Sequence, residues 1–214
     1  NYPLLDGRVQ TCPHLLLESQ RTNLIPYSED FSNAAWTKTN GSINANDSIS
    51  PDGTLNADLF IPTSANALHY FFDVITASNN TYSASVFVKA KEYKNLQFYL
   101  RGGTGSNNRI EGVFDGDLGT TVFSQSGTFT LVDGKTENYG NGWYKISMTG
   151  NVPATETTCL FFLQPLDDNF NETFAGNGTD GILIYGAQLE EGSYPTSYIV
   201  SNSGSATTRL AEVC

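Results

Sequence analysis

Apolar and polar side chains alternate along much of this sequence. From 82 to 91, one face carries Tyr82, Ala84, Val86, Val88 and Ala90, and the other carries Ser83, Ser85, Phe87, Lys89 and Lys91. Residues 95–101 repeat the pattern, with Leu96, Phe98 and Leu100 inward and Gln97, Tyr99 and Arg101 outward. A period of two predicts half-buried strands. Since a short polar turn at 92–94 joins them, we expect an antiparallel hairpin.

Further strands are predicted at 68–75, 110–114, 120–124, 128–133, 143–149, 158–164 and 181–189. Turn signals such as Asp115-Gly116 and Asn141-Gly142 separate them,. Only residues 28–32 suggest a helix, of one turn at most. The pattern predicts an all-β fold, a two-sheet antiparallel β-sandwich (jelly roll). We expect an N-terminal arm at 1–22, the jelly-roll domain at 23–200 and a C-terminal connector at 201–214.

The net charge of the chain limits the classes of partner that it is expected to bind. It has 22 acidic against 11 basic residues, for a net charge of −11. This balance argues against nucleic acid, which needs a basic face, and against an anionic membrane surface. No apolar run approaches the roughly 20 residues that span a bilayer. The opening residues lack a signal-peptide pattern, and we interpret the chain as a fragment of a longer polypeptide,.

Catalytic and redox motifs are not evident in the sequence. Cys12, Cys159 and Cys214 form no C-x-x-C pair, which favours isolated thiols and allows at most one internal bridge,. His14 and His69 lie far apart, and no hydrolase signature accompanies either of them,. No spacing singles out a pair of carboxylates for glycoside hydrolysis. We therefore predict that the chain is not an enzyme.

The outward residues of the predicted strands suit sugar recognition. A pyranose stacks its C–H face on aromatic rings and bonds its hydroxyls to planar polar side chains. The candidate carbohydrate-binding residues are Phe87, Gln97, Tyr99, Arg101 and Gln164. Alternatively, Phe87 and Tyr99 form a cross-strand pair that stabilises the sheet, or a loop or a neighbouring subunit covers them. Residues 68–74 carry rings on both faces, as in a strand buried on both sides, and Trp36 and Trp143 are predicted to be core residues.

Three stretches together resemble a bacteriophage module. They are residues 12–32 followed by Trp36-Thr37, residues 140–147, and residues 184–199 followed by 207–211. They are similar to the carbohydrate-binding-module-like jelly rolls of phage tail fibres and head spikes, distant relatives of the xylan- and glucan-binding modules of glycanases. The resemblance implies a non-catalytic module of a virion surface protein (fibre, spike or capsid decoration) that contacts bacterial host-surface polysaccharide.

That resemblance also bears on assembly. It implies other virion proteins as partners, and a homotrimer is compatible with it. Two alternatives remain open at this point. One is a purely structural or assembly module of the virion that binds no sugar, and the other is a fragment of a depolymerase.

A structural Ca²⁺ is left open by the same resemblance. Glycanase-linked relatives hold calcium partly through acidic residues of their last strand, where this chain has Tyr185 and Gly186. Asn23 or Glu29, joined by an oxygen from the final strand, would be a second way to make a site. Residues 44–47, 115–117 and 167–169 also offer oxygen ligands, but without EF-hand spacing,. The metal ligands therefore stay unassigned.

Overall fold

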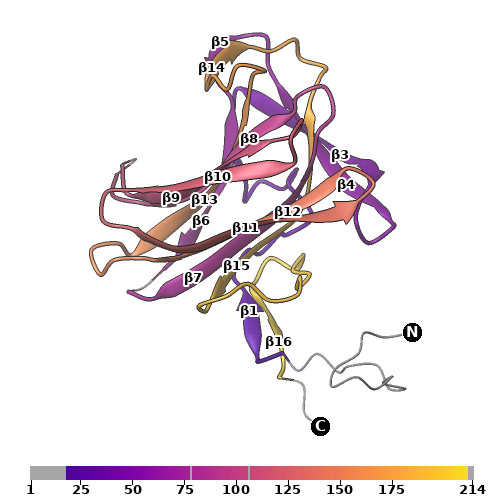
Figure 1. Cartoon of the computed structure of the whole chain (residues 1–214). Coiled ribbons are helices and arrows are strands. Elements are labelled where there is room, and N and C mark those ends of the chain that lie inside the picture. The colour runs from indigo at the N-terminus through magenta and orange to yellow at the C-terminus, as the bar shows by residue number, and fades with distance from the viewer. Residues whose placement is uncertain (1–17, 78, 106, 212–214) are drawn as a thin grey trace, which may run out of the picture.

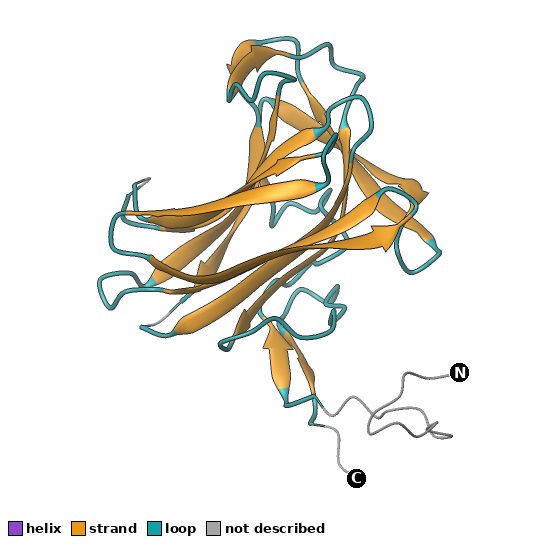
Figure 2. Cartoon of the chain, viewed as in Figure 1, coloured by secondary structure: helices purple, strands orange, loops and turns teal. Residues whose placement is uncertain are grey.

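A computed structural model describes residues 18–77, 79–105 and 107–211. Figures 1 and 2 show two layers of strands. The described residues form no helix, and therefore no helix long and apolar enough to cross a membrane. The predicted all-β, two-sheet antiparallel sandwich is confirmed. Residues 28–32 do not form the helical turn that the sequence suggested. Instead Asn33 N–H donates to the Asp30 carbonyl and Trp36 N–H to the Asn33 carbonyl, which makes successive turns.

Each large sheet has six antiparallel strands. The first sheet has the order β10 (Thr120–Ser126), β9 (Arg109–Asp115), β8 (Asn95–Gly102), β13 (Thr158–Leu166), β6 (Tyr70–Thr76) and β2 (Thr37–Thr39). The second has the order β11 (Thr130–Gly140), β12 (Trp143–Asn151), β7 (Thr81–Lys89), β15 (Ile182–Glu191), β4 (Leu55–Pro62) and β3 (Gly41–Ile49). The chain passes repeatedly from one sheet to the other, as in a jelly roll.

Two small sheets lie beyond the sandwich. β5 (Asn66–Leu68) pairs with β14 (Thr173–Ala175), and β1 (Arg21–Asn23) pairs with β16 (Thr207–Arg209). Figure 1 shows these two pairs at opposite ends of the molecule. The strand predicted at 68–75 is therefore interrupted at His69. This buried ring contacts the Asn40 carbonyl (2.6 Å) through Nδ1 and the Phe174 carbonyl (2.8 Å) through Nε2, which fastens the β5–β14 pair to the sandwich.

Aromatic side chains fill the space between the sheets. Trp36 lies 4.9 Å from Phe31, 5.7 Å from Phe71 and 6.0 Å from Phe161 between ring centroids, and its indole N–H donates to the Tyr27 carbonyl. Trp36 is thus a core residue, as predicted. Trp143 is also buried, but in a separate cluster on the outer face of the second sheet.

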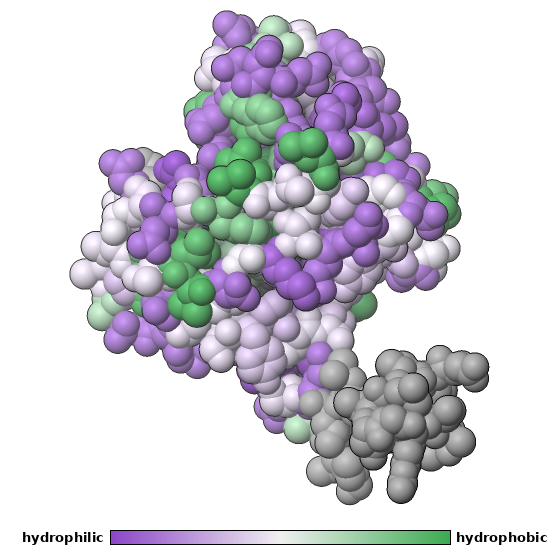
Figure 3. All heavy atoms as spheres, viewed as in Figure 1, coloured by the Kyte–Doolittle hydropathy of each residue, from purple (hydrophilic) through white to green (hydrophobic). Residues whose placement is uncertain are grey.

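The surface carries apolar side chains as well. Figure 3 shows hydrophobic residues gathered in the middle of one face, amid hydrophilic ones.

The predicted hairpin between residues 82–91 and 95–101 is wrong. β7 pairs with β12 and β15 in the second sheet, whereas β8 pairs with β9 and β13 in the first. The inward faces were predicted correctly from Tyr82 to Val88 and from Leu96 to Leu100, since these residues are buried in the same core, whereas Ala90 lies beyond β7 and is half-buried. The outer faces of both strands are largely buried too, so the strands are not half-buried as predicted. The two inward faces cover each other across the sandwich, where stacked sheets lie roughly 10 Å apart. The connecting segment at 90–94 is long enough to make that crossing.

The three cysteines divide between described and undescribed residues. Cys159 is a free, buried thiol on β13. Cys12 and Cys214 lie outside the described residues. Six strands were not predicted: the long β3 and β4 and the short β1, β2, β14 and β16. β3 is mostly polar, with Ile43 and Ile49 as its apolar residues, and shows no clear alternation.

Candidate functional site

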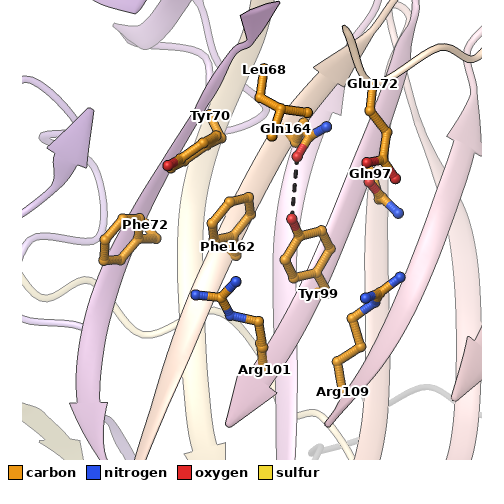
Figure 4. Close-up of a pocket in the computed structure, with 10 residues that line it drawn as sticks. All are labelled: Leu68, Tyr70, Phe72, Gln97, Tyr99, Arg101, Arg109, Phe162, Gln164 and Glu172. Carbon is orange, nitrogen blue, oxygen red and sulfur yellow. Dashed lines mark hydrogen bonds between the residues drawn. The ribbon is translucent and has the colours of Figure 1, made fainter. Parts of the chain in front are cut away.

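A hollow of about 390 Å³ lies on the outer face of the first sheet. Figure 4 shows its lining, with rings in the middle, amides at one end and two guanidinium groups at the other. The lining residues come from β6, β8, β9 and β13 and from the neighbourhood of the β5–β14 pair: Leu68, Tyr70, Phe72, Gln97, Tyr99, Arg101, Arg109, Phe162, Gln164 and Glu172. The hollow thus combines apolar rings with amides and charges in one place.

Four aromatic rings form the floor of the hollow. Cross-strand pairing sets Phe162 on β13 opposite Tyr99 on β8 and Phe72 on β6. The Phe162 ring is stacked 4.3 Å from Tyr99, 4.7 Å from Tyr70 and 5.7 Å from Phe72, with interplanar angles of 14°, 28° and 5°. The neighbours bury Phe162 to 4% exposure and leave Tyr70 and Phe72 half-buried. Tyr70 and Phe72 therefore present ring surface to a ligand.

Two glutamines stand side by side next to the rings. Gln97 and Gln164 are cross-strand partners, so their side chains share one face. The Tyr99 hydroxyl donates to Gln164 Oε1 (3.2 Å), and Gln97 Nε2 donates to Glu111 Oε2 (3.1 Å). Gln164 Nε2 and Gln97 Oε1 are left buried with no partner among the described residues. A buried polar group without a partner costs about 1–3 kcal/mol, which a ligand bonded to it would offset.

Burial also fixes the protonation of the phenol in this network. It raises the pKa of Tyr99 well above its ordinary value, and the guanidinium groups of Arg101 and Arg109 only partly oppose this effect. Tyr99 therefore keeps its hydroxyl proton at neutral pH. It donates to Gln164 Oε1, so the Gln164 amide nitrogen lies on the side of the amide away from Tyr99.

Four of the five predicted site residues meet in this hollow: Gln97, Tyr99, Arg101 and Gln164. Phe87 does not join them. It lies on β7, on the outer face of the second sheet, at 4% exposure. Tyr139, Tyr185 and Tyr198 surround its ring at centroid distances of 4.9, 5.8 and 6.1 Å. Phe87 is therefore separated from the hollow by the thickness of the sandwich. Its ring is covered by the three tyrosines, unlike the half-buried rings of Tyr70 and Phe72.

Sequence reasoning missed several residues of the hollow. Tyr70 and Phe72 were not selected, because residues 68–74 carry rings on both faces and were interpreted as buried on both. Phe162 on β13 was not selected either, although Gln164 of the same strand was. In the structure Phe71 faces the core, and its neighbours Tyr70 and Phe72 face the hollow. Arg109 was missed because the predicted strand began one residue later, at 110.

The position suggested for calcium holds a phenol instead. The Tyr185 hydroxyl lies 2.8 Å from Glu29 Oε1 and 2.9 Å from Asp52 Oδ2, so the two carboxylates share its single proton,. Burial raises the pKa of Asp52, but hydrogen bonds from Ser50, Thr54 and Tyr185 outweigh it and hold this pKa below its ordinary range. No group of three or more His, Cys, Asp or Glu that could hold a metal occurs among the described residues. The residues near Tyr185 do not fit a calcium ion, which prefers six to eight oxygen ligands.

The acidic loops use their carboxylates to hold their own backbones. Asp115 Oδ1 accepts the N–H groups of Asp117 and Leu118, in the hairpin turn between β9 and β10. Asp167 Oδ1 accepts the N–H groups of Asn169 and Asn171. These carboxylates are accounted for by local turns.

No family model and no curated protein matches this chain. Similar solved structures include the enzymatically active domain of bacteriophage CBA120 tailspike protein 4, with 12% identity and a TM-score of 0.46 over 78% of this chain and 21% of that one. They also include the CBM22-1 xylan-binding domain of Paenibacillus barcinonensis Xyn10C, with 13% identity and a TM-score of 0.45 over 81% of this chain and 94% of that one. The chain thus spans about a fifth of the tailspike chain.

A third similar structure contains the CBM22-1 and GH10 modules of the Clostridium thermocellum xylanase 10B in complex with xylohexaose. It has 14% identity and a TM-score of 0.41 over 78% of this chain and 27% of that one.

Proposed function

We propose that this chain is a non-catalytic carbohydrate-binding module and that the hollow on the first sheet binds a glycan. One observation carries the proposal. A buried acceptor, Gln97 Oε1, and a buried donor, Gln164 Nε2, belong to paired residues next to a floor of rings, and neither atom has a partner in the described part of the chain. A sugar hydroxyl both donates and accepts a hydrogen bond, so one hydroxyl, or two neighbouring ones, would satisfy both atoms.

The rings provide the other half of sugar recognition. The C–H face of a pyranose packs on half-buried aromatic surface, which Tyr70 and Phe72 supply,. The hydrogen bonds made to the sugar replace bonds to water, so the net gain per contact is small. We therefore expect weak binding at a single hollow. Repetition in an assembly such as a homotrimer would raise the overall avidity.

The carboxylates of the region argue against catalysis. Of the described residues that line the hollow, only Glu172 carries a carboxylate. The nearby Glu111 accepts hydrogen bonds from Gln97, Arg109 and Ser124. Glycoside hydrolysis in most families uses two carboxylates across the scissile bond. We expect no release of reducing ends from any glycan that binds, and such release would identify a depolymerase instead.

The biological setting is proposed from the sequence motifs. They resemble modules of phage fibres and spikes, so we propose a place on the virion surface, with bacterial host polysaccharide and other virion proteins as partners. An assembly module without sugar binding is the alternative. It is favoured by exposed apolar side chains near the β10–β11 region, Leu118, Val122 and Val132, at 72%, 73% and 53% exposure, which could dock onto another protein,.

A glycan array with neutral and acidic polysaccharides tests the proposal. We expect at least one glycan to be retained by the wild-type chain. Gln97→Ala and Gln164→Ala should each weaken its binding about three- to tenfold, as loss of one hydrogen bond implies. Gln20→Ala is the matched control, because Gln20 is exposed and lies outside the hollow. If no glycan is retained, the assembly alternative stands.

A further inference from the structure

Two arginines face each other at one end of the hollow. Arg101 on β8 and Arg109 on β9 are cross-strand partners, so their side chains leave the sheet on the same face. Figure 4 shows both guanidinium groups reaching toward the rings on either side of Tyr99. Their Cζ atoms lie 5.4 Å from the Phe162 ring centroid and 5.5 Å from that of Tyr99, respectively. Like charges directly opposite each other on a sheet are destabilising.

Among the residues that the structure describes, a carboxylate pairs with only one of the two arginines. Arg109 Nε lies 2.6 Å from Glu111 Oε2, the same oxygen that accepts the Gln97 amide, and Glu111 Oε1 accepts the Ser124 hydroxyl. Glu111 is thus fully engaged. Within the described ranges, Arg101 forms no ion pair, and its Nε is buried without a partner. This is notable in a chain with twice as many acidic as basic residues, 22 against 11.

The remaining carboxylate of the hollow does not reach Arg101. Glu172 is exposed, just before β14, and forms no ion pair among the described residues. Figure 4 shows it beside Gln97, at the end of the hollow opposite the two arginines. The hollow therefore has a cationic end and an end of amides and a carboxylate. A ligand that complements it carries its negative charge at the arginine end.

We propose that the glycan bound here is an acidic one whose carboxylate pairs with Arg101, an inference that rests on the proposed function. A guanidinium binds a carboxylate through two parallel N–H···O bonds and is weakly hydrated, so it suits a half-buried ion pair flanked by rings. The ligand carboxylate balances the charge that Arg101 and Arg109 place together. Its sugar ring rests on Tyr70 and Phe72, and its hydroxyls meet Gln97 and Gln164. A uronic acid residue within a polysaccharide has this combination of groups.

The test compares acidic polysaccharides with the same polymers after carboxyl reduction. The probes are polygalacturonate, alginate and hyaluronan, their carboxyl-reduced forms, neutral xylan, β-glucan and mannan, and a sulfated and a phosphorylated glycan. We expect at least one uronate polymer to bind and its reduced form to bind at least tenfold more weakly. Arg101→Gln should lose the same factor for the uronate and change binding of the reduced form less than twofold. Arg101→Lys should restore binding only in part, because it lacks the planar fork.

Lys94→Gln is the control, since it removes one positive charge at an exposed residue outside the hollow. It should leave uronate binding unchanged. Equal binding of a uronate and its reduced form, or preference for a neutral, sulfated or phosphorylated glycan with no effect of Arg101→Gln, would overturn this inference and leave the proposed function intact. Retention of no glycan of any kind would overturn the proposed function, and the inference with it.

Discussion

The Tyr99 hydroxyl donates a hydrogen bond of 3.2 Å to Gln164 Oε1, and the amide nitrogen of the same glutamine is buried with no partner among residues 18–77, 79–105 and 107–211. One contact within the protein thus orients an unused donor. We interpret this arrangement as stability given up for binding. A fold without a ligand to bind would gain from removing the unpaired group.

The double variant Tyr99→Phe/Gln164→Leu separates binding from stability. It removes both partners of the hydrogen bond and the unpaired amide together, and such a replacement is close to neutral for folding or stabilising. We expect a melting temperature equal to or above that of the wild type, measured by calorimetry, and glycan binding weakened at least tenfold. A variant that melts much earlier would show that the amide is bonded within the protein.

The exposed ring surface should matter for binding more than for folding. Tyr70→Ala removes a half-buried ring that stacks 4.7 Å from Phe162. We expect glycan binding to weaken about three- to tenfold, in keeping with the roughly 0.5–1.5 kcal/mol of an aromatic contact. Tyr139→Ala, which removes a half-exposed ring over the second sheet, is the control and should bind as the wild type does. Equal losses in both variants would contradict the position of the site.

Asp73 should make the protein less stable as pH rises. Burial raises its pKa to about 6 from an ordinary 3.8, and one of its oxygens has no partner among the described residues. The folded state therefore holds the proton more tightly than the unfolded state. The stabilisation of the folded state by protonated Asp73 is fully present below about pH 4 and is lost as pH rises through about 6,.

Replacing Asp73 by Asn tests this sign. Asp73→Asn cannot ionise, so we expect it to be more stable than the wild type at pH 7.5, by about 1–3 kcal/mol. The difference should shrink at pH 4.5. Urea unfolding at both pH values measures it, and a variant less stable than the wild type at pH 7.5 would show that the ionised carboxylate is favourably paired.

The cluster around Tyr185 should make the fold independent of calcium. The single proton of the phenol hydroxyl is shared between the carboxylates of Glu29 and Asp52, and a donor thus occupies the space between them. We expect EDTA and added Ca²⁺ to leave the melting temperature of the wild type unchanged. Tyr185→Phe leaves the two carboxylates without this donor and should cost about 1–3 kcal/mol. A drop in melting temperature on adding EDTA to the wild type would reveal a bound metal.

His69 should hold the wall of the hollow. Its two ring nitrogens contact the carbonyls of Asn40 and Phe174, so the ring links the β5–β14 pair to the sandwich. His69→Ala leaves the buried Phe174 carbonyl without this partner, whereas the Asn40 carbonyl keeps the Thr63 N–H as donor, and it should destabilise the fold by about 1–3 kcal/mol,. Hydrogen exchange should rise first at residues 66–68 and 173–175. Protection unchanged there would mean that the pair is held by its other contacts.

The sequence predicted which face of a strand points outward better than it predicted which strands pair. The alternation in 95–101 placed Gln97, Tyr99 and Arg101 on the outer face correctly, because burial of Leu96, Phe98 and Leu100 depends only on the period of the strand. The same alternation placed Phe87 outward, but period two does not say to which sheet a strand belongs. Because the chain crosses from the second sheet to the first at 90–94, Phe87 and Tyr99 lie on opposite outer faces of the sandwich.

The charge pattern of the hollow depends on cross-strand register. Arg101 and Arg109 are eight residues apart in sequence and meet only because β8 and β9 pair in one register. A slip by one residue would turn one of them to the core. Likewise Tyr70 and Phe72 join Phe162 through the pairing of β6 with β13, which the sequence does not reveal.

A crystal structure of the chain with the tightest-binding glycan of the array tests the central claim most directly. We predict density for a sugar over Tyr70 and Phe72, with hydroxyls within hydrogen-bond distance of Gln97 Oε1 and Gln164 Nε2. A sugar bound instead on the second sheet, near Phe87 or Tyr139, with the hollow filled by water, would contradict it.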